Sequence, residues 1–157
     1  DDNFKGNFPG SRGIKHTFKS RAILTATIDL QGKIFRIMTS HYSVSDLCTE
    51  TPQMYEISCQ IASLVRHAKA IPTIFSGDLN IRAQSYSVNK LKEVLTCHTE
   101  DFNDTLSANH PAKVKDFPEG LAIDHVFSAN TSFKSIEKQE VDFSNHQAIV
   151  SEFKIIL

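Results

Sequence analysis

A carboxylate and a carboxamide lie two residues apart at the end of an apolar segment. They are Asp78 and Asn80 of Ser-Gly-Asp-Leu-Asn, which follows the run 71–75. Side chains alternate along an extended chain, so residues two apart share a face. The Asp can hold a water or a metal ion and the Asn amide can bind a phosphate oxygen, which suits work on phosphates. A strand followed by an ordinary Gly-Asp-x-Asn turn explains these residues equally well.

Three further segments combine polar and apolar residues in a similar way. They are Met38-Thr39-Ser40-His41-Tyr42, Ile123-Asp124-His125-Val126-Phe127 and Asp142-Phe143-Ser144-Asn145-His146. A charge among apolar residues is costly to bury unless it is paired, so Asp124 needs a partner. A histidine is the natural one, because a carboxylate fixes its tautomer and raises its pKa. The candidates are His41, His125 and His146; His125 should face the opposite side of its strand, so we interpret it as structural.

The composition is that of one soluble globular domain with a hydrophobic core. The chain has 157 residues, 40% hydrophobic and 22% charged. A net charge of −1 excludes a global positive field that would attract nucleic acid. The densest basic stretch is interpreted as a solvated surface, with a local phosphate contact as the alternative; it consists of Lys15, His16, Lys19 and Arg21. Neither a zinc-protease HExxH motif nor the Gly-x-Ser-x-Gly turn of a serine hydrolase occurs.

The cysteines and the hydropathy pattern predict a cytoplasmic protein. Cys48, Cys59 and Cys97 are odd in number and form no CxxC pair, which favours free thiols in a reducing compartment. No apolar run approaches the roughly 20 residues of a membrane span, and no signal peptide opens the chain. The first residue is Asp and not Met, so we expect a processed or shortened chain.

Periodicity predicts the elements that must position these residues. Residues 1–20 contain Gly and Pro among polar residues and are expected to be loop. Strands are predicted over 21–30 and 33–42, joined by a tight turn at Gln31-Gly32. Thr49 or Thr51 should cap a helix that begins at Pro52. Its buried face would carry Met54, Ile57, Ile61, Leu64, Val65 and Ala68.

The second half of the chain adds more strands than helices. We predict a short buried strand over 71–76, a helix over 85–96 and a largely irregular segment over 102–119. Three strands follow, over 121–129, 133–140 and 147–156. The expected fold is α/β, with a mixed, largely antiparallel sheet and flanking helices.

The order of these motifs resembles the exonuclease/endonuclease/phosphatase superfamily, which has the DNase-like fold. A strand ending in Ser-His, a helix, Gly-Asp-Leu-Asn, Ile-Asp-His-Val-Phe and Ser-Asn-His follow one another as in that family, from about Arg21 onward. The segments Phe102-Asn103-Asp104-Thr105 and His110-Pro111 also resemble it. The resemblance implies that residues 1–157 form a single, incomplete domain, the C-terminal part of a four-layer α/β/β/α sandwich.

The resemblance also implies a reaction: hydrolysis of phosphoester bonds with Mg²⁺ or Mn²⁺. Asp78 would activate or orient the attacking water, and Asn80 would position the phosphate. Asp124 would orient His146, which would stabilise the phosphoryl oxygens. His41 would contact the phosphate or act as a general acid. The metal residues would be Asp78, Asn80 and Asn145.

Two departures from the family pattern limit this assignment. The family's Asn and metal-binding Glu belong to a first half that has no counterpart here, so the N-terminal half of the same domain is an expected partner. Asn145 stands where the family usually has Asp, which weakens binding of a hard cation. A catalytically attenuated or inactive member that acts as a binding module is therefore the alternative. The substrate class stays open among nucleic acid, phospholipid and small phosphorylated molecules, and the near-neutral charge favours the smaller ones.

Overall fold

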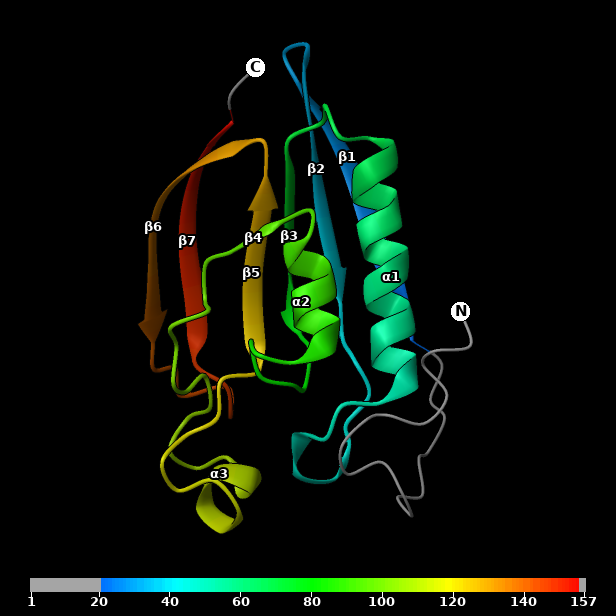
Figure 1. The fold of residues 1–157 in the computed structure, drawn as a ribbon. Coiled ribbons are helices and arrows are strands. Elements are labelled where there is room, and N and C mark those ends of the chain that lie inside the picture. Colours follow the sequence, from blue (N-terminus) through cyan, green and yellow to red (C-terminus); the bar gives the residue numbers. More distant parts are fainter. Residues whose placement is uncertain (1–20, 156–157) are drawn as a thin grey trace.

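Two β-sheets and three α-helices make up residues 21–155, the part of the chain that the computed structural model describes (Figure 1). The loop predicted over 1–20 lies outside the described residues, as do Lys15, His16 and Lys19 of the basic stretch. Within the described part, the fold class is the one the sequence predicts.

The larger sheet has five strands in the order β1-β2-β3-β5-β4. These are β1 (Ile23–Leu30), β2 (Lys33–Ser40), β3 (Thr73–Asp78), β5 (Asp124–Ala129) and β4 (Thr96–Cys97). Only β2 and β3 run parallel; the other neighbours are antiparallel. The prediction of a mixed, largely antiparallel sheet is thereby confirmed.

The β1–β2 hairpin turns at Gln31-Gly32, as the sequence predicts. Both residues have positive φ, +56° and +80°, and the Gly32 N–H donates to Asp29 Oδ1 at 2.7 Å. Two successive residues with φ > 0 match the twist of the flanking strands, which is why a glycine is favoured here. β2 ends at Ser40, two residues before the predicted end at Tyr42, so His41 leaves the sheet.

Helix α1 (Pro52–His67) begins where the capping residues predict. The Thr51 hydroxyl accepts from the Met54 N–H at 3.3 Å, and Pro52 occupies the first turn. Most of the predicted apolar stripe packs on the sheet, but Leu64 is 44% exposed.

Helix α2 (Tyr86–Lys92) is shorter than predicted. The Ser85 hydroxyl caps it by accepting from Val88 N at 3.2 Å. The predicted helix over 85–96 is wrong at its C-terminal end, because residues 96–97 form β4 and pair with β5. Long-range pairing overrides the local helical pattern there.

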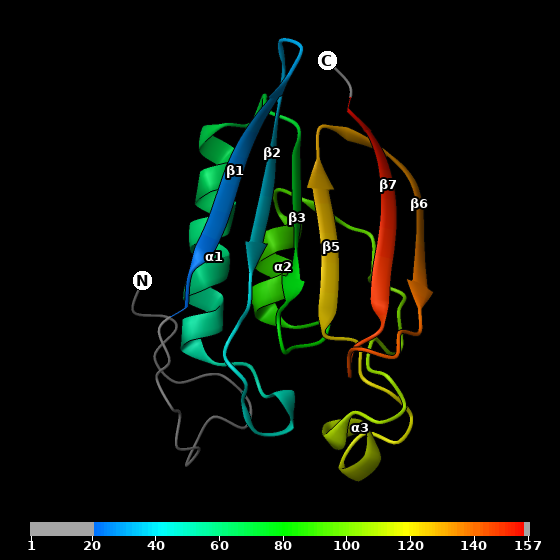
Figure 2. The same cartoon turned by 180° about the vertical axis from the view of Figure 1, so that it is seen from behind.

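A second sheet and a third helix complete the fold. β6 (Thr131–Gln139) and β7 (Ala148–Ile155) form an antiparallel pair beyond β5 (Figures 1 and 2). Helix α3 (Pro111–Lys115) lies in a segment that is expected from the sequence to be loop. Five residues are too few for hydrophobic periodicity to predict a helix.

The core lies between the five-stranded sheet and helices α1 and α2. Phe75 of β3 stacks on Phe127 of β5 with ring centroids 5.5 Å apart, and both are fully buried. Met38 of β2 lies beside them in register with Phe75. Leu106, Leu121 and Ile123 form a separate, smaller hydrophobic cluster, against which Phe117 packs.

The opposite face of the five-stranded sheet carries no helix, as Figure 2 shows. Ala26, Ile37 and Ile74 are register partners across β1, β2 and β3 on this face. Ile37 is 40% exposed and Leu24, on the same face of β1, is 67% exposed. Within the described residues, this face is an open apolar surface.

Gly77 allows β2 and β3 to approach closely beside the last residue of β3. A Cβ built on Gly77 would lie 2.0 Å from the Ser40 carbonyl oxygen and 3.1 Å from its carbon. Real Cβ atoms do not make such contacts, so only glycine fits this position. The glycine therefore sets the position of Asp78.

Replacing Gly77 with alanine should push β2 and β3 apart. We expect Gly77→Ala to lower the free energy of unfolding by about 3 kcal/mol or more, measured by urea denaturation. Gly32→Ala is the control: Gly32 has φ +80°, but a Cβ placed there would have no heavy atom within 4 Å. It should cost only about 1–2 kcal/mol through left-handed backbone strain. Equal costs for the two variants would contradict this account.

Candidate active site

The sheet edge at which β3 ends and β5 begins gathers the polar residues singled out in the sequence. β2 and β3 both end there, β5 starts there, and β7 starts nearby (Figure 1). His41 follows β2, Asp78 ends β3, Asp124 opens β5 and His146 precedes β7. Four segments that are distant in sequence therefore meet at one edge.

Asp78 and Asp124 are direct register partners on antiparallel strands. Directly opposite side chains project from the same face, so the two carboxylates point to the same side. Burial raises the pKa of Asp78, and the nearby charge of Asp124 raises it further. The Asn80 backbone N–H partly offsets this effect by donating to Asp78 Oδ1 at 2.9 Å.

Asp124 has the partner that its apolar surroundings require. The His146 Nδ1–H donates to Asp124 Oδ2 at 2.8 Å, and the Thr105 hydroxyl donates to the same oxygen at 2.6 Å. The hydrogen bond to Asp124 raises the pKa of His146. With Nδ1 committed to Asp124, Nε2 is the nitrogen left for a ligand.

Residues 104–107 hold the His146 segment against β5. Leu106 and His146 form an isolated β-bridge, and the Gln147 N–H donates to the Thr105 carbonyl at 2.8 Å. The Thr105 hydroxyl also accepts from the N–H of Asp124 at 3.2 Å. Thr105 therefore fixes both partners of the Asp124–His146 pair. No role for it is predicted from the sequence, although it lies in a segment that resembles the family.

His41 lies on the solvent side of Asp78. Its Nε2 is 3.3 Å from Asp78 Oδ2, and its side chain is 57% exposed. This position gives an incoming ligand access to the histidine.

Asn80 reaches the site in a different way from the predicted one. The backbone does not run extended through it, because Asn80 has φ +52° and lies beyond the end of β3. Its side-chain amide donates to the Tyr42 carbonyl at 3.2 Å, and the residue is only 6% exposed. The expectation that strand alternation aligns Asp78 with Asn80 is therefore wrong; an Asx-type turn places them together.

Asn145 contacts the loop beside the site through its backbone. Its carbonyl accepts from the Ser107 N–H at 3.0 Å, and the residue is exposed. The carboxylate opposite Asp78 is that of Asp124 on β5, and from the segment before β7 the cluster includes His146.

His125 is structural, as its position next to Asp124 predicts. It is 1% exposed on the helix-facing side of β5. Its Nε2–H donates to the Ile81 carbonyl at 2.8 Å, and Nδ1 accepts from the Thr99 hydroxyl at 3.1 Å. Burial lowers the pKa of this ring.

His110 is a further ring at the site, and the sequence alone does not assign it. Its plane is nearly perpendicular to that of His146, with centroids 5.2 Å apart. Burial lowers the pKa of His110, and the positive charge of His146 lowers it further. The sequence signals are its place in a segment that resembles the family and the Pro111 that follows it, a residue that suits the first turn of a helix.

The cluster has a donor set that fits a divalent cation. Ligand atoms of Asp78, Asp124 and His146 all lie within 4.8 Å of one another. Magnesium takes oxygen ligands at about 2.0–2.1 Å and commonly uses one or two protein carboxylates, together with water and phosphate oxygens. The carboxylate pair matches this preference, and a cation would also relieve the repulsion from Asp124 that adds to the effect of burial on the pKa of Asp78.

A cavity of about 260 Å³ opens behind the carboxylates, between the five-stranded sheet and β7. Ile74, Val126 and Ile149 contribute apolar walls, and Asp78 and Asp124 line its end. It is continuous with the open sheet face that carries Ile74.

The raised pKa of His146 can be measured by NMR titration of its ring proton in metal-free protein. We expect a pKa above the usual value of about 6.5, and a lower one in Asp124→Asn. Because folding raises this pKa, the pair stabilises the fold below about pH 6.5. That contribution disappears as the pH rises through the folded-state pKa. His98 is the control ring, because burial lowers its pKa and Asp124 has no part in that shift. An unchanged His146 titration in Asp124→Asn would rule out this coupling.

Two further findings concern the cysteines and the helices. Cys48, Cys59 and Cys97 are free thiols, as predicted. Among residues 21–155, no helix has the length and apolar character that crossing a membrane requires.

Comparisons with solved structures identify the fold. The endonuclease/exonuclease/phosphatase of Bacteroides vulgatus aligns over 87% of this chain and 56% of its own, with a TM-score of 0.64 and 21% identity. The catalytic domain of human Nocturnin, with a bound sulfate anion, aligns over 88% of this chain and 54% of its own, with a TM-score of 0.63 and 12% identity. Mannosyl-6-phosphatase Bt3783 of Bacteroides thetaiotaomicron aligns over 85% of this chain and 57% of its own, with a TM-score of 0.58 and 19% identity.

The chain spans little more than half the length of these structures, 54–57%. No protein-family model and no curated protein matches the sequence. The likeness therefore rests on three-dimensional structure, together with the order of the motifs. On that basis the chain has the fold of the endonuclease/exonuclease/phosphatase superfamily, as the sequence resemblance predicts.

Proposed function

We propose that this protein belongs functionally to that superfamily and hydrolyses phosphoester bonds with Mg²⁺ or Mn²⁺. The observation that carries the proposal is the cluster of Asp78, Asp124 and His146, whose ligand atoms lie within 4.8 Å of one another at one sheet edge. Its support comes from the fold, which is shared with a mannosyl-6-phosphatase and with the Nocturnin catalytic domain.

The metal would be held by Asp78 and by Asp124 Oδ1, which makes no hydrogen bond within the described residues. A bound divalent cation would neutralise phosphoryl oxygens and lower the pKa of a water molecule. Of the other predicted metal residues, Asn80 would position the phosphate with the second hydrogen of its amide, since the first donates to the Tyr42 carbonyl. Asn145 would help to hold the His146 segment in place through the backbone hydrogen bond that it accepts from Ser107.

Hydrolysis forms a P–O bond to water and breaks the P–O bond of the ester. Asp78 would orient the water and accept its proton, consistent with the raised pKa of Asp78. His146 would donate from Nε2 to a phosphoryl oxygen, held in orientation by Asp124. His41, being exposed, would protonate the leaving oxygen. The net charge of −1 favours a small phosphoester over long duplex DNA.

Single substitutions test this assignment in the natural full-length polypeptide. Asp78→Ala, Asp124→Ala and His146→Ala should each lower the kcat for magnesium-dependent hydrolysis of bis(p-nitrophenyl) phosphate or p-nitrophenyl phosphate by at least about 100-fold. His67→Ala, at the C-terminal end of α1, is the matched control and should retain the wild-type rate. Wild-type turnover in any of the three variants would refute the assignment. An inactive wild-type protein that binds phosphate would instead favour the alternative, an inactive binding module.

We further propose that residues 1–157 are the C-terminal portion of the domain and that an N-terminal half covers the open sheet face. The exposed Ile37 and Leu24, together with the 260 Å³ cavity, leave apolar surface in contact with water. The 54–57% coverage of the solved structures supports this. In the same assay, residues 1–157 alone should hydrolyse substrate far more slowly than the full-length polypeptide; equal rates would contradict the proposal.

A further inference from the structure

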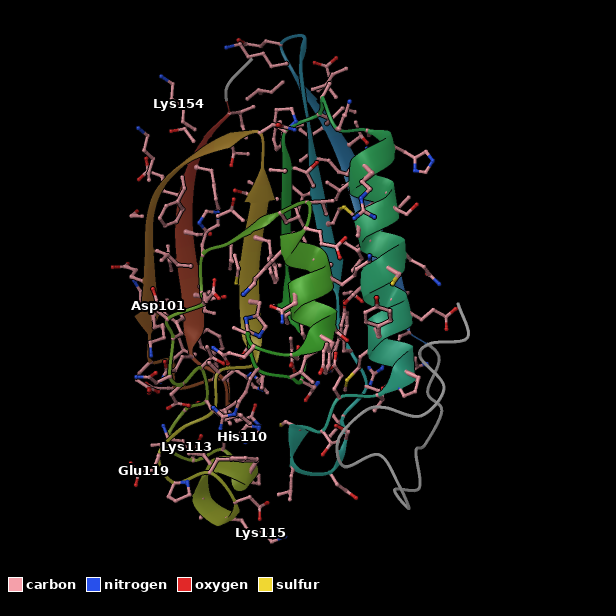
Figure 3. All side chains as sticks on the ribbon, in the orientation of Figure 1. Asp101, His110, Lys113, Lys115, Glu119 and Lys154 are labelled. Carbon is pink, nitrogen blue, oxygen red and sulfur yellow. The ribbon has the colours of Figure 1, made fainter. Side chains whose placement is uncertain are left out.

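His110 has a fixed orientation next to the Asp124–His146 pair. It lies between α3 and the ends of the strands, whereas Lys115 lies at the outer end of α3 (Figure 3). The ring stands at 88° to the His146 ring, with centroids 5.2 Å apart. A ligand bound at His146 would therefore lie within reach of His110.

The start of α3 determines which nitrogen of His110 carries the proton. The Ala112 backbone N–H donates to His110 Nδ1 at 3.1 Å. Nδ1 is therefore an acceptor, and in the neutral ring the hydrogen must lie on Nε2. Nε2 makes no hydrogen bond within the described residues, so the ring offers one unused donor.

The loop that carries His110 is well anchored. The His110 N–H donates to the Ser107 carbonyl at 3.0 Å, and Ser107 is tied to the His146 segment through Asn145. Lys113 forms an ion pair with Asp104 and also donates to the Leu106 carbonyl at 3.2 Å. Lys113 is thereby already engaged, whereas His110 Nε2 makes no hydrogen bond among residues 21–155.

We propose that His110 is a substrate-contacting residue that donates its Nε2–H to a phosphoryl oxygen of the ligand held at His146. This inference rests on the proposed phosphoester site, which it extends by a neutral donor from the 103–120 loop. Its physical basis is that a hydrogen bond to a charged group is stronger than one between neutral groups. A neutral donor also avoids a second positive charge beside His146.

Two substitutions separate this role from helix capping. Asn and Asp both accept hydrogen bonds at helix N-caps, so His110→Asn and His110→Asp keep the cap and remove the ring. His110→Asn should weaken binding of inorganic phosphate, and raise KM, by roughly tenfold or more. His110→Asp should weaken phosphate binding further and raise KM further, because it adds a negative charge. The control is His67→Asn at the end of α1, which should leave the phosphate affinity and KM unchanged.

The binding measurement is calorimetry with inorganic phosphate, on the natural full-length polypeptide with magnesium, with thermal unfolding recorded in parallel. Weaker phosphate binding with an unchanged Tm supports the contact; wild-type affinity in His110→Asn overturns it. Should the variants fail to fold, nitrogen NMR of the wild-type protein decides: phosphate must shift the His110 Nε2 resonance, and an unmoved resonance overturns the inference. Phosphate binding that depends on His110 in a protein without hydrolytic activity would refute the proposed function alone.

Discussion

Two carboxylates directly opposite one another on adjacent strands are the constraint on which this structure depends. Like charges placed this way are destabilising. The ligand atoms of the cluster lie within 4.8 Å of one another. At that upper limit, and with an effective dielectric constant near 20, the repulsion between two full charges is about 3 kcal/mol. The surrounding groups counteract it: His146 pairs with Asp124, while His41 and a backbone N–H approach Asp78. Burial, together with the remaining repulsion from Asp124, still raises the pKa of Asp78, so this compensation is incomplete.

The topology of the sheet brings these groups together. Because β3 and β5 are antiparallel, the end of one lies beside the start of the other. Because β2 runs parallel to β3, His41, which follows β2, lies at the same edge. The stacked Phe75 and Phe127 secure β3 against β5 on the helix-facing side. The side chains of the site project from the other side of the same two strands. Packing on one face of the sheet therefore sets the distances between functional groups on the other.

Much of this site can be predicted from the sequence, for physical reasons that differ between residues. Asp124 is conspicuous because a charge in an apolar strand needs a partner, and alternation excludes His125 in favour of a more distant histidine. For Asn80 the strand pattern suggests continued extension, whereas the Gly-Asp-x-Asn turn, the other explanation of these residues, is the one that the positive φ bears out. The short strand β4 depends on pairing with β5, and the place of His110 depends on how the 103–120 loop packs. Both are long-range effects that local patterns do not contain.

The central claim is that the Asp78–Asp124 pair holds a divalent cation. Paramagnetic Mn²⁺ tests it directly, because it broadens NMR signals of nearby nuclei. Titrating the natural full-length polypeptide with substoichiometric Mn²⁺ should broaden the amide signals of 77–80 and 124–125 first, with Mg²⁺ reversing the effect in competition. An Asp78→Asn, Asp124→Asn double variant should lose this pattern while keeping its fold. Broadening centred elsewhere, or unchanged in the double variant, would contradict the account.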